Sequence, residues 1–200
     1  MGVDLIKKKG FEAEGVHTAA NPEEQTVLQF LYPNLLTQKV IDIISDFEIK
    51  GIYRTIIYCN SLSSSIDLEK VRAKQPKTLL VTPLDIYCRL ARNYTSIMLW
   101  AANAQSLAGI EKVFYEHNPS IQILGLSMLP VVEAIERLSL PEDIIEQFNM
   151  SSMAPRLPRI EALVLGCTHF PYLKDKLSVS FEVIDPTEKM LEVLMEYKTN

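Results

Sequence analysis

One stretch of the sequence, from Ala162 to Pro171, reads Ala-Leu-Val-Leu-Gly-Cys-Thr-His-Phe-Pro. Its first four residues are apolar and predict a buried β-strand, after which Gly166 allows the backbone to turn sharply. The proline suits the first turn of a helix, so Cys167 is expected between a strand end and a helix start. A helix start favours a thiolate, and the neighbouring His169 can exchange a proton with it. The stretch indicates a reactive thiol, with a buried structural cysteine as the alternative.

A second cysteine, Cys59, has the same setting. The apolar run at 55–58 predicts a strand that delivers Cys59, Asn60 and Ser61, and a Ser-rich turn and a helix follow. If two related halves face each other across a cleft, the two thiols meet there. The remaining cysteine, Cys88, lies in a predicted helix among apolar neighbours, which favours a role in core packing.

Strands alternate with helices along most of the chain. Strands are expected at 55–58, 78–81, 97–100, 121–124, 162–165 and 181–184, with helices between them and a further strand at 11–17. Residues 21–34 are expected to form a loop. This order predicts an α/β fold of two similar small domains, with mainly parallel sheets flanked by helices and a cleft between them. The first domain is expected to comprise residues 1–90 and 186–200, and the second residues 91–185.

Composition excludes several classes of function. The formal net charge is -5 and there is no long basic cluster, which argues against nucleic-acid binding. No apolar run is long enough to cross a membrane, and the polar start lacks the core of a signal peptide, so a cytoplasmic location is expected. The three cysteines are widely spaced, which favours free thiols, and no cluster has the spacing of metal ligands.

The two cysteine segments together resemble a known family. Cys59-Asn60-Ser61 and the motif from Gly166 to Pro171 look like the paired signatures of the cofactor-independent aspartate/glutamate racemases. The Thr-His-Phe-Pro ending resembles glutamate racemases more than aspartate or hydantoin racemases. The segments 103–116, 129–133 and 184–186 also occur in the family's order, so the resemblance covers most of the chain from about Val16 onward.

The resemblance implies a mechanism. Two domains would enclose the amino acid, with Cys59 and Cys167 on opposite faces of its α-carbon. One thiolate would remove the α-proton while the other thiol protonates the far side, and no metal or cofactor would be needed. The remaining residues carried over by the resemblance are His169, which would assist the second cysteine, and Asn60, Ser61 and Thr168, which would hold the substrate carboxylate and amine.

The implied function is a racemase that interconverts L- and D-glutamate, with aspartate as the second choice of substrate. Family members begin with a strand whose acidic turn assists the first cysteine, and this sequence starts within what resembles the following helix. The segment from His17 to Pro22 also replaces the family's usual Pro-Tyr-Gly loop. These departures leave two alternatives open: a non-catalytic truncated homologue that binds a small dicarboxylate, and a related hydantoin or maleate enzyme. Family members are often dimers, so the implied partners are a small acidic amino acid and a second copy of the chain.

Overall fold

The protein is described by a computed structural model that covers residues 2–150 and 160–196. The strands are β1 (Arg54–Ile56), β2 (Leu79–Val81), β3 (Ser96–Ala101), β4 (Gln122–Ser127), β5 (Ala162–Gly166) and β6 (Glu182–Ile184). The α-helices are α1 (Gly2–Lys8), α2 (Pro22–Leu31), α3 (Pro33–Ile49), α4 (Asn60–Ser65), α5 (Leu68–Lys74), α6 (Pro83–Leu90), α7 (Ala104–His117), α8 (Leu129–Glu136), α9 (Pro141–Gln147) and α11 (Thr187–Glu196). Two 3₁₀ helices, η1 (Ala91–Asn93) and η2 (Phe170–Lys176), complete the described elements.

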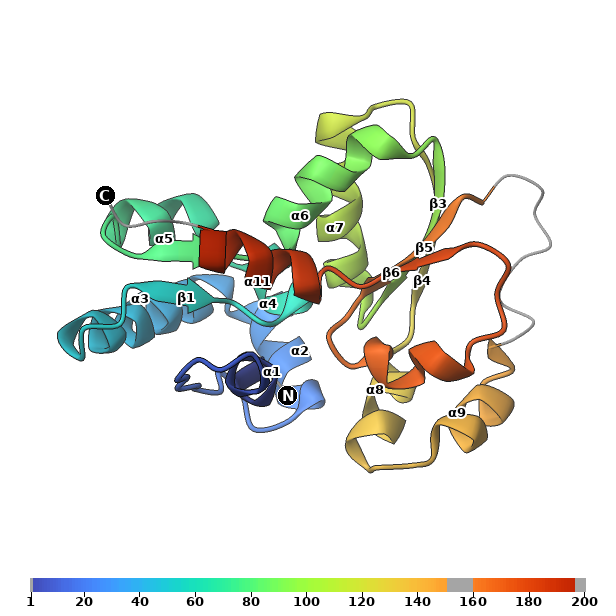
Figure 1. Ribbon diagram of the computed structural model, residues 1–200, viewed down its shortest axis with the longest axis horizontal. Helices are drawn as coiled ribbons and strands as arrows, with labels where there is room; N and C mark the ends of the chain where they lie inside the picture. The colour runs from blue at the N-terminus through green and yellow to red at the C-terminus, as the bar shows by residue number, and fades with distance from the viewer. Residues whose placement is uncertain (1, 151–159, 197–200) are drawn as a thin grey trace.

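The strands form two sheets, shown in Figure 1 with α3 and α5 beside the first and α8 and α9 below the second. The first sheet pairs β1 with β2, and the second has the order β4-β3-β5-β6. Every pairing is parallel, with Thr55 opposite Leu80 in the first sheet and Leu99 opposite Val164 in the second. Parallel strands require crossover connections, and helices supply them here. The predicted α/β class with parallel sheets is confirmed.

Helices cover both faces of the second sheet, and the inner strand β3 sends alternate side chains to each face. In β3, Ile97 and Leu99 join an apolar cluster with residues of α6 and α7. Met98 and Trp100 point the other way, into a cluster with residues of α8, α9 and η2. There the ring of Trp100 meets Phe170 edge-on, with 6.2 Å between ring centroids. The whole strand is buried, as its apolar sequence predicts.

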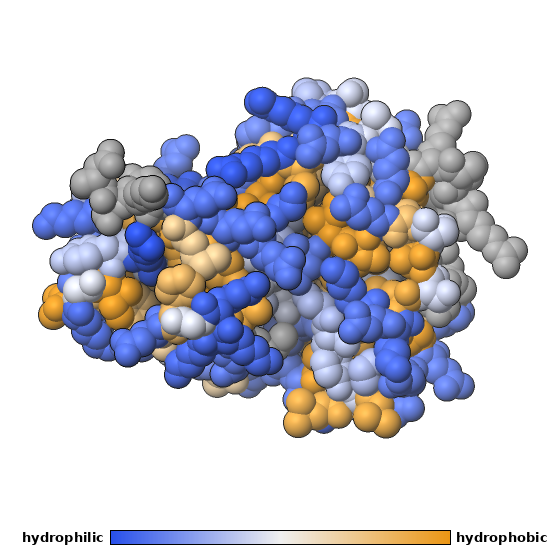
Figure 2. All heavy atoms as spheres, in the orientation of Figure 1, coloured by the Kyte–Doolittle hydropathy of each residue, from blue (hydrophilic) through white to orange (hydrophobic). Residues whose placement is uncertain are grey.

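The first sheet is also covered on both faces. Leu80 of β2 packs against Leu36 and Val40 of α3 in a separate apolar cluster. Its neighbour Val81 belongs to the same cluster as Ile97 and Leu99, together with Met190 of α11. One apolar cluster therefore connects both sheets through α6 and α11, and Figure 1 shows α11 lying between them. Hydrophilic residues cover much of the outer face seen in Figure 2.

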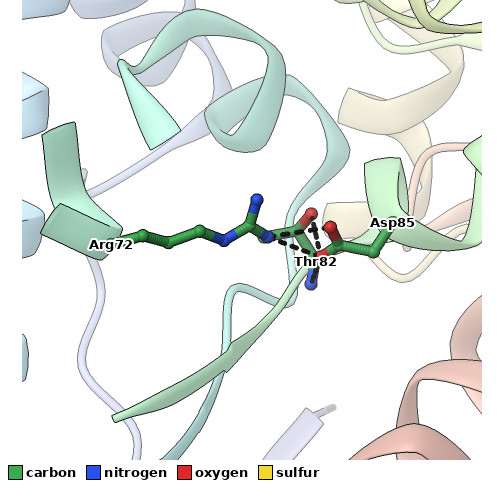
Figure 3. Close-up of polar contacts among 3 residues, drawn as sticks. All are labelled: Arg72, Thr82 and Asp85. Carbon is green, nitrogen blue, oxygen red and sulfur yellow. Dashed lines mark hydrogen bonds and ion pairs between the residues drawn. The ribbon is translucent and has the colours of Figure 1, made fainter. Parts of the chain in front are cut away.

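The start of α6 is held by polar contacts at the carboxyl end of β2. The carboxylate of Asp85 accepts hydrogen bonds from the backbone N–H and the hydroxyl of Thr82, at 2.8 and 2.9 Å. The Arg72 guanidinium of α5 donates to both oxygens of the same carboxylate at 2.8 Å (Figure 3). This arrangement caps the helix and ties α5 to α6.

Two predictions for the first part of the chain were wrong. Residues 11–17 form no strand, because they run exposed between α1 and α2 without a neighbouring strand to pair with. Residues 22–31, expected to be part of a loop, form α2. The Asn21 side chain accepts a hydrogen bond from the Glu24 N–H at 2.8 Å, and Pro22 occupies the first turn, so this segment has a complete helix start.

Two further differences lie in the second half. The segment after β5 is the 3₁₀ helix η2 rather than an α-helix, and it ends before Leu177. Of the loop expected at 149–158, residues 151–158 lie outside the described residues. The domain boundaries stay a prediction.

Candidate active site

Cys59 lies just beyond the carboxyl end of β1 and caps the amino end of α4. The Leu62 N–H donates a hydrogen bond to its Sγ, at 3.5 Å. The hydroxyl oxygen of Ser61 is 3.4 Å from the same sulfur. The side chain is partly exposed. The first predicted thiol therefore lies beyond a strand end, beside one backbone donor and one hydroxyl.

Cys167 occupies the corresponding place after β5. Its Sγ lies 3.4 Å from Nδ1 of His169, whose Nε2 lies 2.8 Å from a carboxylate oxygen of Glu136. The backbone N–H groups of His169 and Phe170 also interact with this sulfur. Cys167, His169 and Glu136 thus form a line of proton-carrying groups, in which the carboxylate comes from the end of α8. Sequence reasoning missed Glu136, because no local pattern relates it to the cysteine.

The protonation state of Cys167 depends on burial and on local hydrogen bonds. Burial raises the pKa of its thiol from the ordinary value of 9.0 to about 12. The backbone N–H groups of His169 and Phe170 act in the opposite direction, while negative charge on Cys59 and on Glu136 raises the pKa further. The N–H groups after the strand thus favour thiolate as predicted, but burial has the larger effect on this pKa. Desolvation outweighs the local donors, and the group is a thiol at neutral pH.

Gly166 is needed here for space rather than for a special turn. It is the last residue of β5, and its φ angle lies outside the left-handed region. A Cβ at this position would lie 2.7 Å from the carbonyl oxygen of Trp100 in the neighbouring strand. The glycine thus permits close approach of β5 to β3 directly before Cys167.

Buried amides surround the first cysteine. Asn60 is 2% exposed, and its Oδ1 accepts a hydrogen bond of 2.5 Å from the hydroxyl of Tyr87. Its Nδ2 is buried and has no hydrogen-bond partner among the described residues. Behind Ser61, the buried Gln29 of α2 donates to the serine hydroxyl at 2.9 Å. Gln29 was missed because its segment was expected to be a loop.

A cleft of about 1670 Å³ connects these groups. Its lining includes every residue predicted for the site, namely Cys59, Asn60, Ser61, Cys167, Thr168 and His169. Glu136 and Asn103 lie in the same lining, as do α1 and the segment that follows it. The volume exceeds the roughly 300–1,000 Å³ of typical small-molecule pockets. The cleft therefore has room for a molecule the size of an amino acid.

The described residues also contain neither a candidate metal site nor a candidate membrane span. Within residues 2–150 and 160–196, no three His, Cys, Asp or Glu side chains are grouped so that they could hold a metal ion. A search of the same residues finds no helix with the length and apolar character needed to cross a membrane.

Comparison with known proteins gives a partial sequence match and several matching folds. No family model matches the chain. A glutamate racemase of Streptococcus pyogenes (serotype M49) is 32% identical over 74 residues, which cover 37% of this chain and 27% of that protein. A second, from Streptococcus thermophilus, is 30% identical over 86 residues, which cover 40% of this chain and 32% of the relative. The matches thus span about a third or less of the relatives' length.

Solved structures with the same fold cover more of the chain. A glutamate racemase isoform from Bacillus anthracis has a TM-score of 0.74 at 16% identity, covering 97% of this chain and 75% of that one. A glutamate racemase from Francisella tularensis, in complex with D-glutamate, has a TM-score of 0.65 at 18% identity, with 84% and 66% covered. An aspartate racemase from Picrophilus torridus has a TM-score of 0.66 at 14% identity, with 97% and 87% covered.

The fold and the cleft therefore define an α/β protein with the architecture of the amino-acid racemases. In part of its sequence the chain is also similar to glutamate racemases, so both sequence and fold resemble the aspartate/glutamate racemases. The family resemblance predicted from the two cysteine motifs is confirmed.

Proposed function

We propose that this chain is an amino-acid racemase that interconverts L- and D-glutamate through two thiols, with aspartate as the second substrate. The observation that carries the proposal is the shared lining of one cleft by Cys59 and Cys167, which come from strand ends of different sheets. Charge on Cys59 also raises the pKa of Cys167, so the two sulfur atoms interact electrostatically. Racemisation requires a base and an acid on opposite faces of one carbon, and two identical groups can exchange these roles.

The protonation state of Cys167 suggests which thiol acts first as the base. Its buried thiol carries the proton and suits the role of the acid, so the proposal gives Cys59 the role of the base. The Cys59 sulfur takes the α-proton, and the electron pair of the broken C–H bond stays on the carbon. The Cys167 thiol then gives its proton to the opposite face and becomes a thiolate. The reverse reaction starts from this second state and exchanges the roles.

Cys167 must therefore also exist as a thiolate in part of the cycle. His169 lies between its sulfur and the Glu136 carboxylate, where an imidazole can accept and return the proton. The backbone N–H groups of His169 and Phe170 already favour the thiolate. A substrate ammonium group in the cleft adds a positive charge that acts in the same direction.

Neutral donors in the cleft suit a substrate carboxylate. Nδ2 of Asn60 is a buried donor without a partner among the described residues, and Thr168 lines the same cleft. A bound carboxylate would satisfy the Asn60 amide, which otherwise keeps an unpaired buried donor. D-glutamate in complex with one structural neighbour supports an acidic amino acid as the substrate.

Isotope exchange tests the proposal directly. Incubation with L- or D-glutamate in heavy water should introduce deuterium at the α-carbon and change the optical rotation. Cys59→Ser and Cys167→Ser should each reduce racemisation by roughly a thousandfold or more, because serine is a far weaker acid than cysteine. Cys88→Ser is the matched control, because Cys88 lies outside the cleft lining. No exchange with glutamate or aspartate in the unmodified protein would refute the racemase.

A second candidate is a non-catalytic homologue that binds a small dicarboxylate. The wide cleft favours it, because closed, water-poor sites suit carbanion chemistry better. This candidate predicts that calorimetry detects glutamate binding in both Cys→Ser variants, with no turnover in the unmodified protein. Measurable turnover excludes it. The expected homodimer, the cytoplasmic location and the hydantoin or maleate alternative stay predictions.

A further inference from the structure

A buried line of side-chain amides leads from the second sheet to the first cysteine. Gln29, which is 0% exposed, donates from Nε2 to the Ser61 hydroxyl oxygen at 2.9 Å. Its Oε1 accepts a hydrogen bond of 3.2 Å from Nδ2 of Asn103 at the start of α7. The Gln105 side chain donates to the Gln29 backbone carbonyl at 3.0 Å and holds α2 in place. The line therefore joins α2, α4 and α7.

A backbone donor at one end fixes the direction of every bond in the line. The Ser106 N–H donates to Oδ1 of Asn103 at 2.8 Å, and an N–H group can only donate. The Asn103 amide must therefore turn its Nδ2 toward Gln29. That donor requires the Oε1 of Gln29 opposite it, so the Nε2 of Gln29 faces Ser61. Neither amide can be reversed without placing two donors or two acceptors against each other.

The direction of the line determines what Ser61 can do. Its oxygen accepts from Gln29, so the single hydroxyl proton is free for another partner. In the described part of the chain, its other hydrogen-bond partner is Sγ of Cys59, at 3.4 Å. A thiolate has no proton to give, so the serine hydroxyl is the donor in that state. The bond to a charged sulfur is then stronger than the bond to a neutral thiol.

We propose that Ser61 stabilises the thiolate of Cys59 by donating a hydrogen bond. Gln29 and Asn103 are positioning residues: Gln29 donates to the Ser61 oxygen, so the Ser61 hydroxyl proton remains available for the sulfur. The inference rests on the proposed function, in which Cys59 is the base, and deepens it. It assigns Ser61 to the sulfur rather than to the substrate. Together with the Leu62 N–H, the Ser61 hydroxyl gives the Cys59 thiolate two hydrogen-bond donors.

The test measures alkylation of Cys59 by iodoacetamide in the substrate-free full chain, since only the thiolate reacts. Mass spectrometry of the peptide that contains Cys59 separates it from the other two cysteines. At neutral pH, Ser61→Ala should slow this reaction roughly tenfold, and Ser61→Thr should retain the rate because it keeps the hydroxyl. A substrate-binding role for Ser61 alone would leave the rate unchanged in the absence of substrate.

Gln29→Glu tests the direction of the line. A carboxylate offers only acceptors, so the Ser61 proton turns away from the sulfur, and alkylation should slow as much as in Ser61→Ala. Gln29→Met removes the contact but leaves the hydroxyl free to turn to the sulfur, so the rate should fall only about threefold. If Gln29→Glu does not fold, Gln29→Met and the two Ser61 variants decide the question.

Ser63→Ala is the matched control. Ser63 is 1% exposed and lies in the same helix, but its hydroxyl donates to the Cys59 backbone carbonyl at 2.7 Å. Its removal should leave alkylation unchanged. A wild-type rate in Ser61→Ala overturns the proposal, and a wild-type rate in a folded Gln29→Glu overturns the positioning role. Because alkylation requires no turnover, a chain without isotope exchange but with these rates would refute the racemase and leave the bond to Cys59 supported.

Discussion

Cys167 should make the protein progressively less stable as the pH rises above 9. Its thiol has a pKa of about 12 in the folded protein and an ordinary value of 9.0. Below pH 9 both the folded and unfolded states hold the proton, so the group contributes no pH dependence. Between pH 9 and pH 12 the unfolded state releases the proton and the folded state keeps it. The free energy of unfolding then falls by about 1.4 kcal/mol per pH unit, or about 4 kcal/mol over the whole range.

Urea denaturation of the unmodified protein and of Cys167→Ser, at intervals between about pH 8 and about pH 10.5, measures this effect. The serine does not titrate in this range, so the unmodified protein should lose about 2 kcal/mol more than the variant. Tyr94, whose pKa is also raised by burial and does not depend on Cys167, titrates in both proteins and cancels in the difference. Parallel stability curves for the two proteins would show that Cys167 is not held as a thiol by burial.

Three further substitutions test contacts of the site. Glu136→Gln should lower turnover roughly tenfold in a polarimetric assay, because an amide bonds to the His169 ring less strongly than a carboxylate does. Unchanged turnover would contradict a role for Glu136 in positioning His169. Tyr87→Phe should cost about 1–2 kcal/mol in chemical denaturation, since it leaves the buried Oδ1 of Asn60 without its donor, and a neutral result would mean that water replaces the hydroxyl. Gly166→Ala should cost about 1–3 kcal/mol, because its Cβ meets the Trp100 carbonyl; an unaltered melting curve would show that β5 can shift freely.

Much of the second sheet could be predicted from sequence because its signals are local. The apolar run before Cys167 marks β5, and the run ending at Trp100 marks β3. The two cysteine motifs could be paired because parallel strands of related halves deliver their carboxyl ends to one cleft. Their chemistry could not be inferred in full. The pKa of Cys167 depends on desolvation by groups from several elements, which a helix-start argument does not contain.

The groups behind the cysteines were missed for different physical reasons. Glu136 reaches the site from the end of α8, and only tertiary packing relates it to His169. Gln29 is buried although the nearby apolar residues Val27, Phe30 and Leu31 are exposed, so no apolar stripe marks it as an inward-facing position. Asn103 could have been recognised, since it lies two residues after the end of β3 and has the residue type of a helix cap.

The apolar cluster that includes Val81, Ile97 and Met190 has a consequence for how a ligand reaches the cysteines. Rotating the two sheets apart would pull this cluster open and expose its side chains to water, so large hinge motion is costly. By contrast, residues 9–17 are mostly exposed, belong to no helix or strand, and line the same cleft. We expect entry and release to depend on displacement of this short segment while both sheets keep their relative orientation.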